Sequence, residues 1–290
     1  MVEHHVANVD VAGSNPVSRS DKLKTMLRSP RGIFYLKKSS ACNSETIKEL
    51  GAFHRPVNLT TGFNFLRGGK EGRLGWSGQM NNRSDENQQM ISRQLKRRKI
   101  ETPSVLNAFT KIQRHHFVPE EFQDEAYGDF PLSIGAGQTI SQPFIIALMM
   151  QTLALEKTDE VLEIGTGSGY STALLASIVH WVDSLEFYQN LLDAAQKRLE
   201  HLNLTNYKLW HWNGWTGPPI EKQYDAIIVW ASPNRIPEPL VKSLKNNGRM
   251  IMPIGKNDQK LMLIKNGKNG ITQQFIDWVR FLPLIDGEPL

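Results

Sequence analysis

The 290-residue chain has a single cysteine, Cys42. One cysteine cannot form an intramolecular disulfide, and it excludes a zinc site built on cysteine pairs. The chain also has no run near the roughly 18 apolar residues that a membrane-spanning helix needs, and its N-terminus has no apolar signal core. These absences predict a cytoplasmic protein that has no membrane partner and no metal site.

Most of the chain has no excess of positive over negative residues, although the whole sequence has a formal net charge of +5 at pH 7. Residues 1–80 hold 12 Lys or Arg against 6 Asp or Glu, which leaves 22 against 23 for residues 81–290. A protein that binds nucleic acid through its phosphates needs clustered Lys and Arg side chains. The near-neutral balance of residues 81–290 therefore predicts that nucleic acid is not a partner.

Residues 1–80 lack a sustained apolar period of 2 or 3.6 and are rich in Gly, Ser, Asn and basic residues. Such a segment buries too little apolar surface to offset its chain entropy. We expect a disordered extension, or a start codon assigned too far upstream, with the natural start at Met80 or Met90. The second interpretation rests on residues 13–16, Gly-Ser-Asn-Pro. The DNA of a transfer-RNA gene arm, translated in one reading frame, gives the same four residues. The folded domain is expected to span residues 81–290.

What the chain does contain is a strand, a glycine-rich loop and the start of a helix between Val161 and Ala176. This order is the first unit of a nucleotide-binding α/β fold. Gly165 and Gly167 let the backbone turn sharply and approach a ligand that a Cβ atom would block. Gly169 is expected to let the helix start pack near the strand.

The loop has the spacing G-x-G-x-G, whereas dinucleotide-binding proteins have G-x-G-x-x-G. With the acidic Glu163 before it, the shorter loop suits a ligand that lacks phosphate and has a cationic end, such as S-adenosylmethionine. Glu186 ends the next apolar run, at the position from which a carboxylate accepts hydrogen bonds from ribose hydroxyls. We therefore predict cofactor contacts from Glu163, Gly165, Thr166, Gly167 and Glu186.

Glycines and small hydroxyl residues also surround Ser141, in the stretch from Gly135 to Pro143. A helix is expected to follow over residues 144–153. Ser141 suits its N-cap, with Pro143 in the first turn. From spacing alone, the simplest interpretation is that Ser141 only caps this helix.

Strand-like and helical segments alternate through the rest of the chain. Strands are expected at 181–186, 207–212, 224–230, 249–254, 260–265 and 274–284, and helices at 102–112, 191–202 and 237–244, with a turn at 246–248. This order predicts an α/β fold with a doubly wound sheet and an antiparallel hairpin at its C-terminal edge. His115 and His116 have no acidic or cysteine partner at ligand spacing, so we expect surface or packing histidines.

Residues 90–290 resemble protein-L-isoaspartate O-methyltransferases. The motifs that carry the resemblance occur in family order: Arg114 with Phe117-Val118-Pro119, Ala126–Asp129, Ile134–Pro143, Val161–Tyr170, Tyr224–Val229, Gly248-Arg249 with Met252–Gly255, and Val279–Leu284. The glycine loop is common to many methyltransferases, whereas Gly137–Pro143 is specific to this family. The resemblance implies a Rossmann-like methyltransferase fold with a seven-stranded sheet, and S-adenosyl-L-methionine as methyl donor.

The resemblance also implies the reaction, which is protein repair. A methyl group is transferred to the α-carboxylate of an L-isoaspartyl residue in a damaged protein or peptide, the ester closes to a succinimide, and reopening returns some chains to normal aspartate. The expected partners are therefore isoaspartyl-containing proteins and peptides, and a monomer is expected.

The family's active-site serine falls on Ser141, with Thr139 and Ile140 beside cofactor and substrate, and Asn213 and Gly214 fall on the adenine side. An isoaspartyl carboxylate is already ionised at neutral pH. It needs no general base, so Ser141 is expected to orient it by hydrogen bonding.

The sequence departs from the family pattern at three places. Asn213 stands where the family usually has Asp, Trp230 with the following Ala and Ser replaces smaller residues, and Ile285 stands where Thr is frequent. Two alternatives therefore stay open. One is a member that methylates a carboxylate in one dedicated peptide or partner. The other is a non-catalytic S-adenosylmethionine-binding protein, which the intact Ser141 and glycine loop disfavour.

Overall fold

The computed structural model describes residues 83–290, so the expectations about residues 1–80 lie outside the described residues. The strands within this range are β1 Leu132–Gly135, β2 Gln138–Ile140, β3 Glu160–Ile164, β4 Trp181–Glu186, β5 Tyr207–His211, β6 Tyr224–Val229, β7 Leu244–Ile254, β8 Gln259–Gly267 and β9 Gly270–Val279. The α-helices are α1 Ser84–Met90, α2 Pro103–Lys111, α3 Pro143–Thr152, α4 Tyr170–Ala176, α5 Gln189–His201 and α6 Glu238–Lys242.

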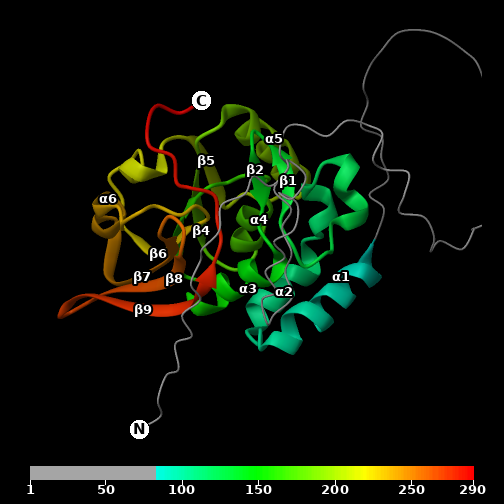
Figure 1. Ribbon diagram of the computed structural model, residues 1–290, viewed down its shortest axis with the longest axis horizontal. Coiled ribbons are helices and arrows are strands. Elements are labelled where there is room, and N and C mark those ends of the chain that lie inside the picture. Colours follow the sequence, from blue (N-terminus) through cyan, green and yellow to red (C-terminus); the bar gives the residue numbers. More distant parts are fainter. Residues whose placement is uncertain (1–82) are drawn as a thin grey trace, which may run out of the picture. The chain divides into compact units, whose positions relative to one another are not determined.

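Seven of the strands form one sheet in the order β5-β4-β3-β6-β7-β8-β9 (Figure 1). The neighbours from β5 to β7 run parallel, whereas β8 and β9 add an antiparallel edge. This confirms the predicted doubly wound, seven-stranded sheet. The strand order reverses between β3 and β6, and ligands of such sheets bind at the carboxyl ends of the strands beside this switch point.

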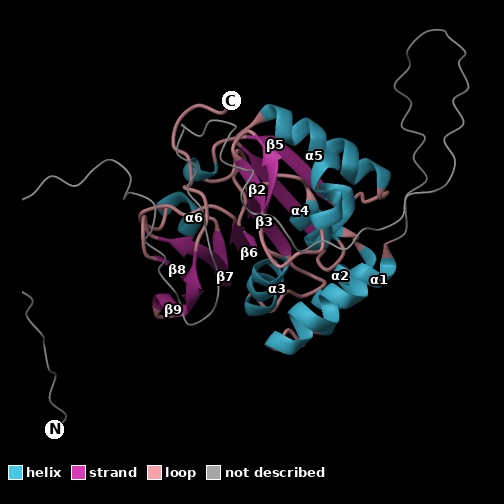
Figure 2. Ribbon diagram, turned by 45° about the vertical axis from the view of Figure 1, so that its right-hand side comes forward, coloured by secondary structure: helices cyan, strands magenta, loops and turns pink. Residues whose placement is uncertain are grey.

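The two faces of the sheet are buried by different elements, because successive side chains of a strand point to opposite faces. On β3, Val161 belongs to a core cluster that includes residues of α1 to α5. Leu162 belongs to a second cluster, which includes Leu240 of α6. Figure 2 shows α1, α2 and α3 gathered on one side of the strands and α6 on the other. Met149 and Met150 of α3 are fully buried.

A separate two-stranded hairpin, β1–β2, lies directly before Ser141 in the chain. Its turn contains Ala136 and Gly137, both at positive φ (49° and 68°), and β2 ends one residue before Ser141. The rich supply of glycine in this stretch is thus explained by a tight turn. The hairpin leads directly into α3.

Predicted boundaries in the C-terminal part of the chain are wrong at the last strand and around β7. The last strand is Gly270–Val279 and does not reach residue 284, because its partner β8 begins at Gln259, which is paired with Val279. The predicted turn at residues 246–248 lies inside β7, where the pairing with β6 shifts register between Tyr224 and Ala226. The turn residues form a bulge there, and Asn247 has a φ of 64°.

No helix within residues 83–290 is long and apolar enough to cross a membrane.

Candidate active site

The glycine loop leaves β3 at the same level at which its two neighbouring strands end. The register pairs Ile164 with Leu185 on β4 and with Val229 on β6. Gly165, Glu186 and Trp230 therefore follow side by side at the carboxyl edge of the sheet. The N–H groups of Gly165 and Thr166 both donate to the Leu185 carbonyl, at 2.8 and 3.2 Å, which fixes the loop over β4.

The three glycines of the loop have positive φ values of 97°, 55° and 87°. Gly165 and Gly167 line a cavity. The expectation for Gly169 needs correction. A Cβ atom at this position would lie 3.2 Å from Cβ of Ala195 and 3.5 Å from Cγ of Leu199, so the close approach is to α5 and not to the strand.

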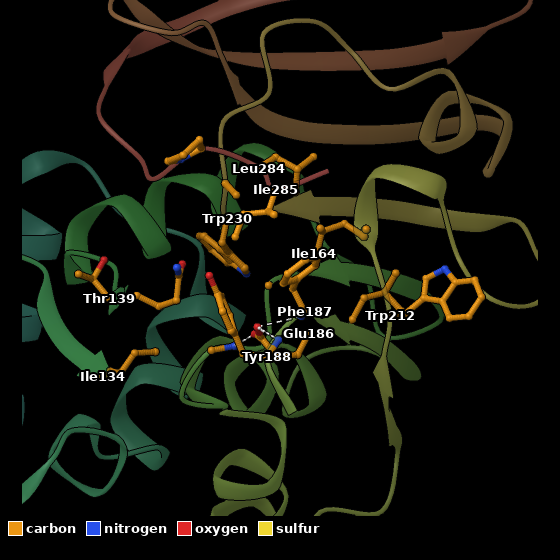
Figure 3. A pocket seen from close by; sticks show the side chains of 17 residues that line it. Ile134, Thr139, Ile164, Glu186, Phe187, Tyr188, Trp212, Trp230, Leu284 and Ile285 are labelled. Atoms are coloured by element: carbon orange, nitrogen blue, oxygen red, sulfur yellow. Dashed lines mark hydrogen bonds between the residues drawn. The ribbon is translucent and has the colours of Figure 1, made fainter. Parts of the chain in front are cut away.

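A cavity with a volume of about 80 Å³ lies above the loop. Its walls come from the ends of β3, β4 and β6, from the residues after β5, from the β1–β2 hairpin and from the C-terminal segment. They are formed by Ile134, Gln138, Thr139, Ile164, Gly165, Gly167, Leu185, Glu186, Phe187, Tyr188, Trp212, Gly214, Trp230, Ala231, Pro283, Leu284 and Ile285 (Figure 3).

Glu186 lies in the wall of this cavity, where the sequence placed it. Its Oε2 accepts the N–H of Gly167 at 2.7 Å, and its Oε1 accepts the N–H groups of Phe187 at 2.9 Å and Tyr188 at 3.0 Å. Burial raises the pKa of the Glu186 carboxyl, and the three N–H donors oppose that shift. The carboxylate joins the glycine loop to the end of β4 and faces the cavity as an acceptor.

Glu163 is fully buried and does not line the cavity. Its Oε2 accepts from the hydroxyls of Thr172 (2.5 Å) and Ser184 (2.7 Å), and its Oε1 accepts from Nε1 of Trp230 (2.8 Å). Burial raises the pKa of this carboxyl, against its hydroxyl and indole donors. Glu163 thus fixes side chains beneath the loop; Ser184 in turn lies 2.6 Å from the Thr166 hydroxyl.

Ser141 lines a second, smaller cavity next to the first. The residues around it are Thr139, Ile140, Ser141, Ile146, Gly165, Thr166, Gly167, Ser168, Tyr170, Ser171 and Trp230. Four of these, Thr139, Gly165, Gly167 and Trp230, also line the first cavity. The structure therefore brings Ser141, Thr139 and Ile140 together with the glycine loop, although they lie more than 20 residues apart in the sequence.

The capping interpretation of Ser141 is wrong. The helix begins at Pro143, its N-cap residue is Gln142, and no side chain makes a capping hydrogen bond there. Ser141 is one residue too early to reach the free N–H groups of the first turn.

Arg114 is a buried cation behind the second cavity, which the sequence marked only as part of a family motif. Its Nε donates to the Ala126 carbonyl at 2.9 Å, its Nη2 lies 3.5 Å from the Ile140 carbonyl, and its guanidinium lies 5.5 Å from the Tyr170 ring centre. Burial lowers the Arg114 pKa to about 10, so the group stays charged at neutral pH. Nη1 of Arg114 and the Tyr170 hydroxyl are buried with no hydrogen-bond partner among the described residues.

Gly214 and Asn213 follow β5 and have different surroundings. Gly214 lines the first cavity, and a Cβ atom there would lie 2.3 Å from Cγ2 of Ile164, so only glycine fits. The Asn213 side chain is not part of the wall. Its Oδ1 accepts the N–H of Trp215 at 2.8 Å and its Nδ2 donates to the Gly287 carbonyl at 2.6 Å. Asn213 thus fastens the C-terminal segment, in which Ile285 lines the cavity.

The two histidines pack, as expected. His115 is buried and its Nδ1 lies 2.7 Å from the Tyr127 hydroxyl. Within residues 83–290, no group of three or more His, Cys, Asp or Glu side chains is placed to hold a metal ion.

The chemistry of the two walls fits S-adenosylmethionine. A carboxylate acceptor stands where ribose hydroxyls are bound in this class of fold, and apolar and aromatic side chains form much of the remaining wall. Among the described residues that line either cavity there is no Lys or Arg, so a phosphate group would meet no counter-charge. The site suits a nucleoside without phosphate.

Comparison with known proteins agrees with this site. The family model for protein-L-isoaspartate(D-aspartate) O-methyltransferase matches residues 85–289. The protein-L-isoaspartate O-methyltransferase of Petrotoga mobilis is 47% identical over 205 residues, which cover 69% of this chain and 95% of the relative. The enzyme of the same name from Proteus mirabilis is 44% identical over 194 residues, covering 67% and 93%.

A solved structure also matches. It is a Plasmodium falciparum protein, described as a protein-L-isoaspartate O-methyltransferase in complex with S-adenosyl-L-homocysteine. It has a TM-score of 0.61 and 29% identity, and the match covers 71% of this chain and 99% of that one. On the family match and these relatives, the chain belongs to the protein-L-isoaspartate O-methyltransferase family.

Proposed function

We propose that this protein transfers a methyl group from S-adenosyl-L-methionine to the α-carboxylate of L-isoaspartyl residues in damaged proteins and peptides. The observation that carries the proposal is that the cavity with Glu186 and the cavity with Ser141 share four wall residues. A donor held in the first and a carboxylate held in the second are therefore neighbours across a common wall.

The first cavity holds the cofactor, which supplies a methyl group activated by a sulfonium. Glu186 accepts hydrogen bonds from the ribose hydroxyls, and the Gly165–Gly167 backbone allows close approach beside it. The absence of a side chain at Gly214 lets its backbone pack directly against Ile164, in the wall beside the adenine ring. Glu163 supports the glycine loop through its hydrogen bond with Ser184, whose hydroxyl contacts that of Thr166. Asn213 supports the cavity wall by holding the C-terminal segment.

The second cavity holds the acceptor carboxylate. The Ser141 hydroxyl donates a hydrogen bond to one carboxylate oxygen and leaves the other oxygen to attack. The carboxylate is ionised at neutral pH, so no residue has to remove a proton. The protein has to align the reacting atoms and exclude water from them. On the acceptor side, the apolar side chains of Ile140 and Ile146 exclude water.

Methyl transfer to paired synthetic peptides tests this function. The full-length chain is incubated with radiolabelled S-adenosylmethionine and peptides that differ only in L-isoaspartyl or L-aspartyl linkage. We expect label in the isoaspartyl peptide and none above background in its partner. Cofactor binding without transfer to any isoaspartyl peptide would favour a non-catalytic binding protein.

Trp230 and Ile285 favour a second candidate, methylation of one dedicated peptide or partner, because both departures from the family pattern lie in the cavity wall. A panel of isoaspartyl peptides with unrelated flanking residues separates the two candidates. Comparable kcat/KM across the panel supports repair, and activity confined to one sequence supports the dedicated substrate.

We infer further that the protein works as a monomer in the cytoplasm, without nucleic acid or membrane partners. The near-neutral charge of residues 81–290 and the single cysteine support this. Sedimentation equilibrium at micromolar concentration tests the oligomeric state, and a mass near twice 32.9 kDa would contradict it.

A further inference from the structure

Trp230 occupies the place where the two cavities meet. It follows directly after β6, its backbone N–H donates to the Ile164 carbonyl at 3.0 Å, and its side chain lines both cavities. Its Cβ lies so close to the loop that a Cβ atom on Gly165 would come within 3.4 Å of it. In Figure 3 the indole projects into the middle of the site, between Thr139 and Ile164.

The orientation of this indole is fixed from below. Its N–H donates to Oε1 of the buried Glu163 at 2.8 Å. The other oxygen of Glu163 is held by Thr172 and Ser184, so the acceptor cannot swing away. A carboxylate on the N–H makes a hydrogen bond stronger than a neutral one, and it makes the indole ring more electron-rich. The π system of this indole, which lines both cavities, thus carries enhanced negative potential.

Few side chains in the walls of the two cavities could stabilise a positive charge at the place where the cavities meet. Glu186 is the one acidic residue among the described residues that line them. Its carboxylate accepts from the N–H groups of Gly167, Phe187 and Tyr188 and, in the proposed function, from the ribose hydroxyls. Glu163 is negative but buried behind Trp230. The indole face is therefore the group through which a cation at the junction can be stabilised, by a cation–π interaction.

We propose that Trp230 recognises the sulfonium charge of the methyl donor and so distinguishes the charged donor from the neutral product. This rests on the proposed function, which places S-adenosylmethionine in the first cavity. When the methyl group leaves, the sulfonium becomes an uncharged thioether, the cation–π attraction is lost, and S-adenosylhomocysteine is held less tightly than the donor. Trp230, with Glu163 positioning it, would then serve both donor binding and product release.

The test is the ratio of two dissociation constants, measured by calorimetry on the full-length chain. S-adenosylmethionine and S-adenosylhomocysteine are titrated into the wild type, Trp230→Leu, Trp230→Met and Trp230→Phe. Removing the ring should lower the preference for the charged ligand by about 2- to 30-fold, the range of one cation–π contact. Trp230→Phe keeps a ring without an N–H and should retain more of the preference than either aliphatic variant.

Trp212→Leu is the matched control, because Trp212 lines the first cavity but not the second. It should leave the ratio unchanged even if both affinities fall. Either aliphatic variant that keeps the wild-type melting behaviour decides the test. If its two affinities shift together, so that the ratio stays within twofold of wild type, Trp230 only fills space and the proposal is overturned. If the wild type binds neither ligand, the proposed function itself fails, which is a different result.

Discussion

At the scale of single residues, Ser141 is the side chain on which the acceptor site depends. We expect both Ser141→Ala and Ser141→Gly to lower kcat/KM for an isoaspartyl peptide, because misplacing a reacting group by about 1 Å costs on the order of 100-fold in rate. The melting temperatures should stay close to wild type, since no side chain makes a capping bond at α3. Steady-state kinetics and thermal melts on both variants check this.

Cofactor binding provides the control for Ser141. Calorimetry should show nearly wild-type affinity for S-adenosylmethionine in both variants, because Glu186 and the first cavity are untouched. Near-wild-type turnover in a folded Ser141→Ala protein would contradict the orienting role.

Glu186 has two functions that one substitution affects together. Glu186→Ala should weaken S-adenosylmethionine binding roughly 10- to 150-fold, or about 1.5–3 kcal/mol, through loss of a charged hydrogen-bond partner. The same change leaves the N–H groups of Gly167, Phe187 and Tyr188 without their acceptor. We therefore also expect a lower melting temperature, which the sequence alone does not indicate. Unchanged cofactor affinity by calorimetry would remove Glu186 from the site.

The burial of Glu186 also gives cofactor binding a pH dependence. Burial raises the pKa of this carboxyl, so as pH falls it takes up a proton at a higher pH than an ordinary glutamate. The protonated form is a poorer acceptor for ribose hydroxyls, and affinity for S-adenosylmethionine should decline through that raised pKa. Calorimetry over a pH series measures this, with Glu186→Gln as control. The same decline in Glu186→Gln would assign the titration to another group.

Single residues also show what the sequence can and cannot place. The spacing from the glycine loop predicted that Glu186 lies at a strand end, because parallel strands in register bring their carboxyl ends together. It did not predict that Glu163 faces the indole of Trp230, 67 residues away. That contact depends on the pairing of β3 with β6, which no local pattern reveals.

At the scale of elements, the C-terminal segment after β9 forms part of the cavity wall and is held by Asn213. Asn213→Asp keeps the acceptor for the Trp215 N–H but loses the donor to the Gly287 carbonyl. We expect faster hydrogen exchange in residues 284–290 and weaker S-adenosylmethionine binding, because Ile285 is no longer held in place. Exchange mass spectrometry and calorimetry measure the two effects.

Wild-type protection of residues 284–290 in Asn213→Asp would contradict this role for Asn213. The remaining ties of the segment would then suffice, notably the backbone bonds from Leu290 to Phe187 and from Gln189 to Leu290.

Element boundaries were predicted well where periodicity alone decides them and poorly where tertiary partners do. The helix expected over 191–202 is Gln189–His201, because its apolar residues recur with helical spacing. The last strand was extended too far. The pairing of β8 with β9 ends at Gln259 and Val279, and the N–H of Phe281 donates instead to the side chain of Gln259. An isolated bridge between Ser232 and Pro283 follows. A strand pattern in the sequence does not predict side-chain acceptors such as that of Gln259.

At the scale of the whole molecule, the composition of the chain separates residues 1–80, with their positive charge, from a nearly neutral remainder. The family match begins at residue 85, just inside α1. The domain boundary between residues 80 and 81 stays a prediction, four residues before the start of this match. Sequence composition could not decide between Met80 and Met90 as a starting point, because the difference depends on what α1 contacts.

Two shortened chains test the boundary, one starting at Met80 and one at Met90. The first keeps all of α1, and we expect it to fold and to methylate isoaspartyl peptides like the full chain. The second loses Asn87, which is buried and donates to the carbonyls of Phe109 (2.9 Å) and Thr110 (3.3 Å) at the end of α2. Leaving such acceptors without a donor costs about 1–3 kcal/mol, so the Met90 chain should melt at a lower temperature. Loss of solubility or most activity in the Met80 chain would show that residues 1–79 contribute to the domain, and equal melting of the two chains would show that α1 before Met90 does not.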